Sequence, residues 1–276
     1  MLEHPLAYRV ENFVSRLKRE SVCMHGFILD VRGEVKATAY YPPFVEGKAH
    51  RMYSVSKSMT VLAIGLLLDE GKISLDDRIA DYFRDFLPEK PDARLMRLKI
   101  RDMLRMATCY RATVYRETDD DWTKPFFTAE PTHEPGTVFH YDTGCSQVLA
   151  ALVARLTGQQ VMDYLTARVF TPLGANDEKH WLCDPAGTCQ GGTGLCMSLR
   201  DLHKVTRLLM DGGRGILPEW FCREMTKKHI DNCLCANEEE RYGYGWQVWM
   251  TRAAWAMYGL ARQLAVVSPD KALCLC

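Results

Sequence analysis

Ser54 and Lys57 form a Ser-x-x-Lys tetrad, the pair of side chains in this 276-residue sequence whose types and spacing best suit covalent chemistry. On a helix, this spacing places the hydroxyl and the amine on one face, one turn apart. A neutral amine can accept the proton of the hydroxyl, and the oxygen can then attack a carbonyl carbon. The tetrad therefore makes Ser54 a candidate nucleophile and Lys57 a candidate general base.

The surroundings of the tetrad separate it from chance matches. A chain of this length contains about one such match at random, and two more begin here at Ser15 and Ser268. Only Ser54 precedes a long apolar helix, where free backbone amides and the positive end of the helix dipole favour a developing oxyanion. Apolar walls around the amine of this tetrad would lower its pKa and keep it neutral.

The composition limits the partners of the protein. The 35 basic and 35 acidic side chains cancel, so a nucleic acid partner is not favoured. The longest apolar run, 59–68, is shorter than the roughly 20 residues that cross a bilayer, so we expect no membrane span. The first residues lack the basic, apolar and small-residue regions of a secretory signal, and we therefore expect a cytoplasmic protein.

The eleven cysteines are interpreted as reduced thiols, because the chain is large and carries no export signal. A structural zinc site is the alternative. Its candidate ligands are His180, Cys183, Cys189, Cys196, Cys233 and Cys235. Their spacings do not match the paired Cys-x-x-Cys knuckles of such sites. We therefore predict no metal and no organic cofactor.

Hydrophobic periodicity predicts early strands, a helical middle and late strands. The early elements are a helix at 11–20, a hairpin of strands at 24–31 and 34–41, and an apolar central helix at 59–68. Helices dominate about 72–184, and the turn Gly191–Gly194 lacks the Gly-Lys-Ser/Thr of a phosphate loop. A helix and four strands follow: 198–210, 242–250, 254–259, 263–267 and 272–276. We expect one antiparallel sheet built from both ends of the chain, with a helical lobe inserted and a cleft between the lobes.

Beyond the tetrad, the sequence resembles the class C β-lactamase-like serine hydrolases, a family that includes penicillin-binding proteins and family VIII esterases. The resemblance rests on Tyr53–Thr60 around the tetrad, on Glu70–Asp77 and on Leu98–Leu104. Matches follow in the order of the family from about residue 24 to 271.

The resemblance implies an α+β fold of the β-lactamase/DD-peptidase type, in which an antiparallel sheet is flanked by helices and an all-helical lobe is inserted. The chain would be a single β-lactamase-like domain, 1–276. Its α/β lobe would consist of residues 1–70 and 185–276, and its all-α lobe of residues 71–184.

The second motif of the family, Tyr-x-Asn, matches Tyr141-Asp142-Thr143, which differs at the third position. The resemblance implies that the Tyr141 hydroxyl contacts Ser54 and Lys57 and passes a proton to the leaving group. An ammonium stabilises a phenolate, so Tyr141 and Lys57 are treated as a coupled pair, and either could take the proton of Ser54. Thr143 lacks the reach of an amide, so it would position a substrate differently.

The third motif, Lys-Thr-Gly or His-x-Gly on a strand lining the cleft, matches Met257-Tyr258-Gly259 within one residue. No cation stands in this motif. Its absence disfavours substrates with a carboxylate, such as β-lactams, unless Arg262 supplies the charge. Small esters and amides are favoured instead.

Further residues are assigned to the cleft through the same resemblance. It implies that the backbone amides of Ser54 and Leu260 form an oxyanion hole. Tyr110 and Tyr115 lie in a loop that resembles the rim of the cleft, where they either contact the substrate or pack as ordinary aromatic residues.

The end of the chain carries a separate expectation. Members of the family usually continue into a helix that covers the sheet, whereas this sequence stops at Cys276. A bare sheet face is covered by a partner or promotes aggregation. We therefore expect either a homo-oligomer or a marginally stable fold.

Two functions fit these motifs. The first is a serine hydrolase that acts on a small ester or amide through a Ser54 acyl-enzyme, with Lys57 and Tyr141 as the proton shuttle. Within this class, a β-lactamase or a D-Ala-D-Ala peptidase is the alternative, and the partner is a small-molecule ester, amide or β-lactam. The second is a catalytically silent binding or regulatory module on the same fold, favoured by the altered second and third motifs.

Overall fold

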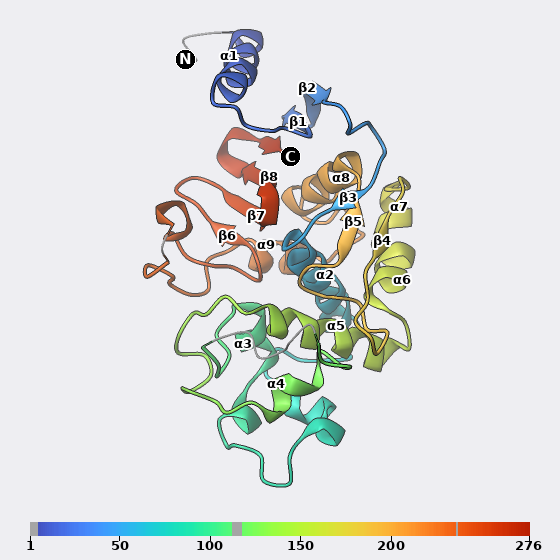
Figure 1. Cartoon of the computed structure of the whole chain (residues 1–276), viewed down its shortest axis with the longest axis vertical. Helices are drawn as coiled ribbons and strands as arrows, with labels where there is room; N and C mark the ends of the chain where they lie inside the picture. The colour runs from blue at the N-terminus through green and yellow to red at the C-terminus, as the bar shows by residue number, and fades with distance from the viewer. Residues whose placement is uncertain (1–4, 112–117, 236) are drawn as a thin grey trace.

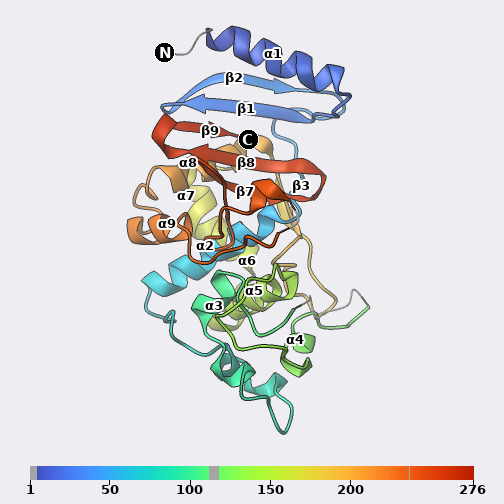
Figure 2. The ribbon, with the colours of Figure 1, turned by 90° about the vertical axis from the view of Figure 1, so that its left-hand side faces the viewer.

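The main sheet joins the two ends of the chain. The computed structural model describes residues 5–111, 118–235 and 237–276. Within these residues, the main sheet has six strands in the order β2-β1-β9-β8-β7-β6, and all neighbours are antiparallel. The strands are β1 (Gly26–Val31), β2 (Glu34–Tyr40), β6 (Trp249–Met250), β7 (Trp255–Gly259), β8 (Gln263–Ser268) and β9 (Leu273–Leu275). Figure 2 shows the first two strands beside the last ones, as the sequence predicted.

One predicted strand is mostly wrong. Residues 242–250 were expected to be extended, but only Trp249–Met250 pairs as β6. The backbone has φ values of 111° at Gly243 and 53° at Gln247, a left-handed conformation that interrupts a strand. Tyr244, Trp246 and Val248 are buried outside the strands of the sheet, whereas Tyr242 is exposed.

The central helix α2 (Val55–Asp69) forms the core of the molecule. Thirteen of its residues are buried, which agrees with the apolar pattern on every side of the predicted helix. Helix α5 (Thr143–Thr157) packs beside it. Gly65 lets α9 (Glu219–Met225) approach, because a Cβ at Gly65 would lie 2.4 Å from the Phe221 ring. The start of α2 is therefore fixed from several sides.

The middle of the chain forms a mainly helical region that extends below and beside α2 (Figure 1). Its elements are η1 (Ile79–Tyr82), η2 (Arg84–Phe86), η3 (Leu95–Arg97), α3 (Ile100–Leu104), α4 (Lys124–Thr128), α5, α6 (Val161–Leu165), η4 (Thr166–Phe170) and α7 (Thr171–Leu173). A short strand, β4 (His180–Trp181), ends this region, so residues 71–184 are not entirely helical. The exact boundaries of the two lobes stay a prediction.

A small second sheet lies close to the start of α2. It contains β3 (His50–Arg51), β5 (Leu195–Met197) and β4 in the order β3-β5-β4. Strands of two or three residues are too short to show the alternation that reveals a strand in a sequence. This sheet was therefore not predicted, although β3 comes just before the tetrad and the Leu195 amide of β5 donates to Ser56 Oγ at 3.0 Å.

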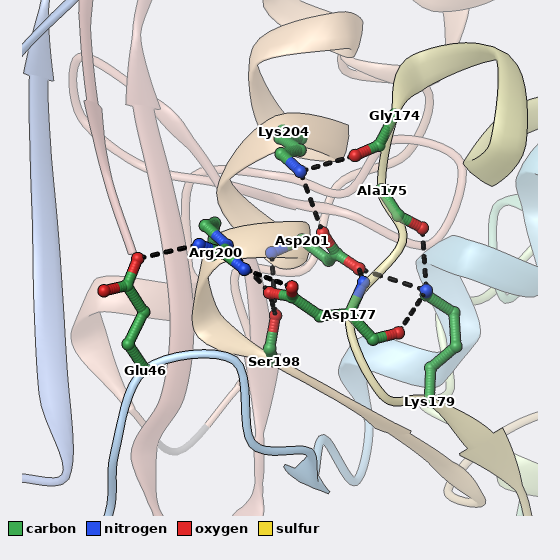
Figure 3. A network of polar contacts seen from close by, with 9 residues as sticks. All are labelled: Glu46, Gly174, Ala175, Asp177, Lys179, Ser198, Arg200, Asp201 and Lys204. Atoms are coloured by element: carbon green, nitrogen blue, oxygen red, sulfur yellow. Dashed lines mark hydrogen bonds and ion pairs between the residues drawn. The ribbon is translucent and has the colours of Figure 1, made fainter.

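A network of polar contacts anchors the connection from α7 to β4 onto α8 (Leu199–Met210), as Figure 3 shows. Asp177 accepts hydrogen bonds from Ser198 Oγ at 2.7 Å and from Arg200 Nε at 2.9 Å. Asp201 accepts from the Asp177 amide at 2.9 Å and pairs with Lys179 at 3.1 Å. The network fixes the chain just before and just after the small sheet.

Two further facts concern the surface of the molecule. Helix α1 (Leu6–Arg19), which starts earlier than the predicted helix at 11–20, contacts the main sheet through Phe13 and Phe27, whose ring centroids lie 5.8 Å apart. Across the described ranges of the chain, no helix combines the length and the apolar character needed to cross a membrane.

Candidate active site

Ser54 stands at the N-cap position of α2, as the tetrad required. The preceding residue, Tyr53, has a φ of 47°, a conformation that is rare for a bulky residue and is concentrated at functional sites. Ser54 is partly exposed, and within the described part of the chain its backbone N–H makes no hydrogen bond. Both the hydroxyl and a free amide are thus available at one point.

Lys57 faces Ser54 from the first turn of α2. Its Nζ lies 3.0 Å from Ser54 Oγ and donates to the Gly192 carbonyl oxygen at 2.9 Å. The side chain is 1% exposed. Burial lowers the pKa of Lys57 to about 7, although the nearby Asp142 carboxylate opposes the shift. A large share of the amine is therefore neutral near pH 7.

Asp142 is a functional neighbour that the sequence analysis did not single out. Its side chain caps α5 by accepting from the Gly144 amide at 2.9 Å, and the residue is fully buried. The carboxylate raises the pKa of Lys57 against the larger effect of burial. The middle residue of the second motif therefore tunes the amine that the first motif provides.

Thr143 and Gly192 pack against each other beside Lys57. A Cβ at Gly192 would lie 2.6 Å from Thr143 Cγ2 and 3.2 Å from Lys57 Nζ. Only glycine leaves room for the close approach of the Gly192 carbonyl to Lys57. The sequence analysis interpreted Gly191–Gly194 as a turn, which is correct, but did not predict its contact with the amine.

Tyr141 lies on the cleft side of the same cluster. Its ring lies 4.9 Å from Lys57 Nζ and stacks on Trp249, with ring centroids 5.3 Å apart. Burial raises the pKa of Tyr141 to about 12, and a hydrogen bond with Ser54 opposes this shift. A phenol ordinarily titrates near pH 10, so an upward shift keeps Tyr141 protonated at neutral pH. Near neutral pH, the pair therefore combines a protonated phenol with a partly neutral amine.

Two hydrogen bonds to Gln247 connect helices α2 and α5 near the tetrad. Ser58 Oγ of α2 donates to the Gln247 carbonyl at 2.6 Å, and Ser146 Oγ of α5 donates to Gln247 Oε1 at 2.7 Å. All three side chains are buried. Because buried polar groups are costly when unpaired, these bonds fix the segment before β6 to both helices.

The third motif forms the opposite side of the cleft. Gly259 ends β7 directly against the segment before Ser54, because a Cβ there would lie 2.2 Å from the Met52 carbonyl oxygen. The cleft has a volume of about 440 Å³. It is lined by Ser54, Tyr141, Cys235, Asn237, Glu240, Trp249, Tyr258, Gly259 and Leu260. The three motifs predicted from the sequence therefore meet in one cavity.

Other predicted cleft residues lie elsewhere. Tyr110 is 1% exposed, and its hydroxyl donates to the Phe126 carbonyl at 2.6 Å, so it is a packing residue and does not contact the cleft. Arg262 lines a separate apolar cavity with Phe13 and supplies no charge to the cleft lining. Tyr115 lies outside the described residues.

Two other features were considered as sites. A larger hollow of about 1000 Å³ lies near α8 and α9, but none of the three motifs contributes to its lining. Among the residues described by the structure, no group of three or more His, Cys, Asp or Glu side chains could hold a metal ion. The eleven cysteines are all free thiols.

The sheet, the inserted helices and the Ser-Lys-Tyr cluster define the fold of β-lactamases and penicillin-binding proteins. The chain belongs to the Beta-lactamase family, which matches residues 26–276. The family and the fold class predicted from the sequence are thereby confirmed.

Known relatives agree with this assignment. The chain is 27% identical over 225 residues to 6-aminohexanoate-dimer hydrolase of Paenarthrobacter ureafaciens, a match that covers 75% of this chain and 57% of the relative. The chain thus spans little more than half the length of that relative.

Two solved structures share the fold at low identity. One is an octameric penicillin-binding protein homologue from Pyrococcus abyssi, with a TM-score of 0.77, 17% identity, and coverage of 98% of this chain and 72% of that one. The other is a D-stereospecific amidohydrolase from Streptomyces sp., with a TM-score of 0.69, 16% identity, and coverage of 91% and 87%.

Proposed function

We propose that the protein is a serine hydrolase that cleaves a small ester or amide through an acyl-enzyme on Ser54. Membership of the Beta-lactamase family and relatives named hydrolase, amidohydrolase and esterase support this enzyme class. The observation that carries the proposal is the 3.0 Å contact between Ser54 Oγ and the buried amine of Lys57, whose pKa burial lowers to about 7.

Acylation begins when neutral Lys57 accepts the hydroxyl proton as Ser54 Oγ forms a bond to the substrate carbonyl carbon. The carbonyl oxygen becomes an oxyanion, which the backbone amides of Ser54 and Leu260 stabilise. The tetrahedral intermediate collapses and the bond to the leaving group breaks. Tyr141 donates its proton to the leaving group and regains one from the Lys57 ammonium.

Deacylation repeats these steps with water as the nucleophile. Neutral Lys57 accepts a proton from water, and the hydroxide oxygen bonds to the acyl carbon. The ester bond to Ser54 breaks, the proton returns to Ser54 Oγ, and the acid product leaves. Both half-reactions use Ser54, Lys57 and the same oxyanion hole, whereas Tyr141 acts on the leaving group in acylation.

One observation supports the alternative function, a catalytically silent binding or regulatory module. The third motif has the buried Met257 where the family carries a cation, and no basic side chain lines the cleft among the described residues. The same observation argues against a β-lactamase or a D-Ala-D-Ala peptidase, whose substrates carry a carboxylate. It leaves the Ser54–Lys57 contact intact, which favours catalysis on substrates without that group.

Ser54→Ala tests the proposal directly. Wild type should turn over p-nitrophenyl acetate many times and should be labelled by a fluorophosphonate, which Ser54 Oγ attacks with loss of fluoride. Ser54→Ala should lose labelling, and kcat/KM should fall by about 10⁴-fold or more. Ser15→Ala, which disrupts a chance Ser-x-x-Lys match on α1, is the matched control and should behave as wild type.

The possible results separate the two functions. Multiple turnovers that disappear only in Ser54→Ala would eliminate the silent module. Equal labelling of wild type and Ser54→Ala, or no turnover of any ester by wild type, would refute the hydrolase.

A further inference from the structure

Part of the cleft lining is aromatic. Trp249 lies between Tyr141 and Tyr258, with ring centroids 5.3 Å and 6.2 Å away and interplanar angles of 24° and 23°. All three rings line the same cavity as Ser54. Trp249 is 8% exposed, so its neighbours cover its faces, and Tyr258 is the partly exposed ring whose electron-rich face attracts a cation in the cleft. One of these rings already has a cation near it, since Lys57 Nζ lies 4.9 Å from the Tyr141 ring.

A carboxylate lines the same cavity as these rings. Glu240, in the short helix η5 (Glu238–Glu240), is half-buried and lines the cleft. Its Oε1 accepts a hydrogen bond from Asn237 Nδ2 at 3.2 Å, and within the described ranges it takes part in no ion pair. Its charge also acts on the cluster around Ser54: burial raises the pKa of Tyr141, and the Glu240 carboxylate adds to that shift.

The described lining contains no positive charge to balance this carboxylate. The nearest basic residue in sequence, Arg241, donates to the Cys235 carbonyl at 2.7 Å and lies 3.9 Å from Glu238. Met257 stands where the family has a cation, and Arg262 lines another cavity. The cleft therefore combines a negative group with aromatic faces, which suits a cationic ligand and repels a carboxylate.

We propose that Glu240, with the ring of Tyr258, binds an ammonium group of the substrate. The protein then prefers esters or amides that carry a positively charged amine in the acyl chain or in the leaving group. This inference rests on the proposed function, since the same Ser54 cleft performs the reaction. It assigns a substrate class and a specificity-determining residue that the three sequence motifs do not contain.

Two pairs of esters, matched in shape and different in charge, test the subsite. For the acyl side, p-nitrophenyl 6-aminohexanoate is compared with p-nitrophenyl heptanoate, in which a methyl group replaces the ammonium. For the leaving-group side, acetylthiocholine is compared with 3,3-dimethylbutyl thioacetate. In at least one pair, wild type should prefer the charged ester by about tenfold in kcat/KM. The preference should shrink as salt is added, because salt screens a partly exposed charge pair.

Glu240→Gln should reduce this ratio of charged to neutral ester toward one. Glu238→Gln is the matched control, since it removes the same charge from the same short helix, but its side chain is 88% exposed and does not line the cleft. That variant should keep the wild-type ratio. If the variant is unstable, inhibition of the wild-type enzyme tests the subsite instead. In that measurement, n-hexylammonium should inhibit competitively and more strongly than 1-heptanol.

The outcomes separate this inference from the proposed function. If wild type hydrolyses none of the four esters, the proposed function fails. If it hydrolyses the neutral esters at least as fast as the charged ones, or if Glu240→Gln leaves a charged preference unchanged, the ammonium subsite is overturned and the hydrolase remains.

Discussion

The catalytic corner and the outer wall of the cleft are built in different ways. The catalytic corner, defined as Ser54, Lys57 and Tyr141, comes from the first turns of α2 and the residues just before α5. The outer wall, defined as Glu240, Trp249, Tyr258 and Leu260, comes from a short helix and strand ends. Lys57 is 1% exposed, whereas Leu260 is 71% exposed.

This difference implies two kinds of chemistry in one cavity. In the corner, burial and short contacts within the protein set the pKa of the base, so the identity of each side chain matters. In the wall, a backbone amide and the partly exposed Glu240 carboxylate are the groups proposed to act on the substrate, so other side chains there can vary while the reaction persists. Of the departures from the family in the third motif, Leu260 lies on this side, whereas Met257 is buried and does not line the cleft.

Lys57→Met should have the largest effect that the comparison predicts. Methionine is apolar and similar in length, so it fits the buried position while the base is lost. We expect kcat/KM for p-nitrophenyl acetate to fall by about 10³- to 10⁴-fold, with the folded state retained in circular dichroism. Lys18→Met, in the chance match on α1, is the control and should keep wild-type activity.

Residual activity would identify the base. If Lys57→Met stays within about tenfold of wild type, the amine is not the base, and burial in the corner does not drive the reaction. Tyr141 would then become the candidate, contrary to the upward shift of its pKa.

Leu260 separates backbone from side chain in the outer wall. Leu260→Pro removes the proposed oxyanion donor, and the extended backbone of Gly259, with φ −127° and ψ 156°, is compatible with a following proline. We expect a loss of about 10²- to 10³-fold in kcat, the usual cost of one oxyanion donor. Leu260→Ala removes only an exposed side chain and should change kcat by less than about twofold.

Steady-state kinetics compares kcat in the two variants. Equal losses in Leu260→Pro and Leu260→Ala would mean that the side chain, and not the amide, acts in the cleft. Wild-type kcat in Leu260→Pro would remove this residue from the oxyanion hole.

The same contrast explains how far the sequence predicted the molecule. The corner was predictable because Ser54 and Lys57 are neighbours on one helix and because the apolar pattern of α2 indicates its burial. The six-stranded sheet was predictable because most of its strands are long enough to show alternation. The small sheet and the interruption of the strand expected at 242–250 were not visible in these local patterns.

The remaining parts depend on contacts between distant segments. The Gly192 carbonyl reaches Lys57 across 135 positions of sequence, and Gln247 joins Ser58 and Ser146 from a turn with a positive φ. Tyr110 was an ambiguous aromatic residue whose burial only the packed structure reveals. Glu240 looked like one of several surface acids, because nothing in its local sequence indicates that it lines the same cleft as Ser54.

The pH dependence of the reaction is the smallest predicted effect and the most specific to the corner. Lys57 must be neutral to accept a proton, and burial lowers its pKa to about 7. The kcat/KM for p-nitrophenyl acetate should therefore decrease as the pH falls through about 7, with a loss of about tenfold between about pH 8 and about pH 6. A flat profile over this range would mean that the base titrates elsewhere.

Asp142→Asn moves this profile in a direction that identifies the titrating group. The Asp142 carboxylate raises the pKa of Lys57, so its removal lowers that pKa and shifts the inflection to lower pH. Asparagine also caps helices well, so α5 should keep its start. Relative to its own plateau, the variant should then be more active than wild type at about pH 6, whereas Asp270→Asn, in an exposed turn, should leave the inflection in place. An inflection that moves to higher pH in Asp142→Asn contradicts Lys57 as the base, because the loss of a neighbouring negative charge can only disfavour its ammonium form.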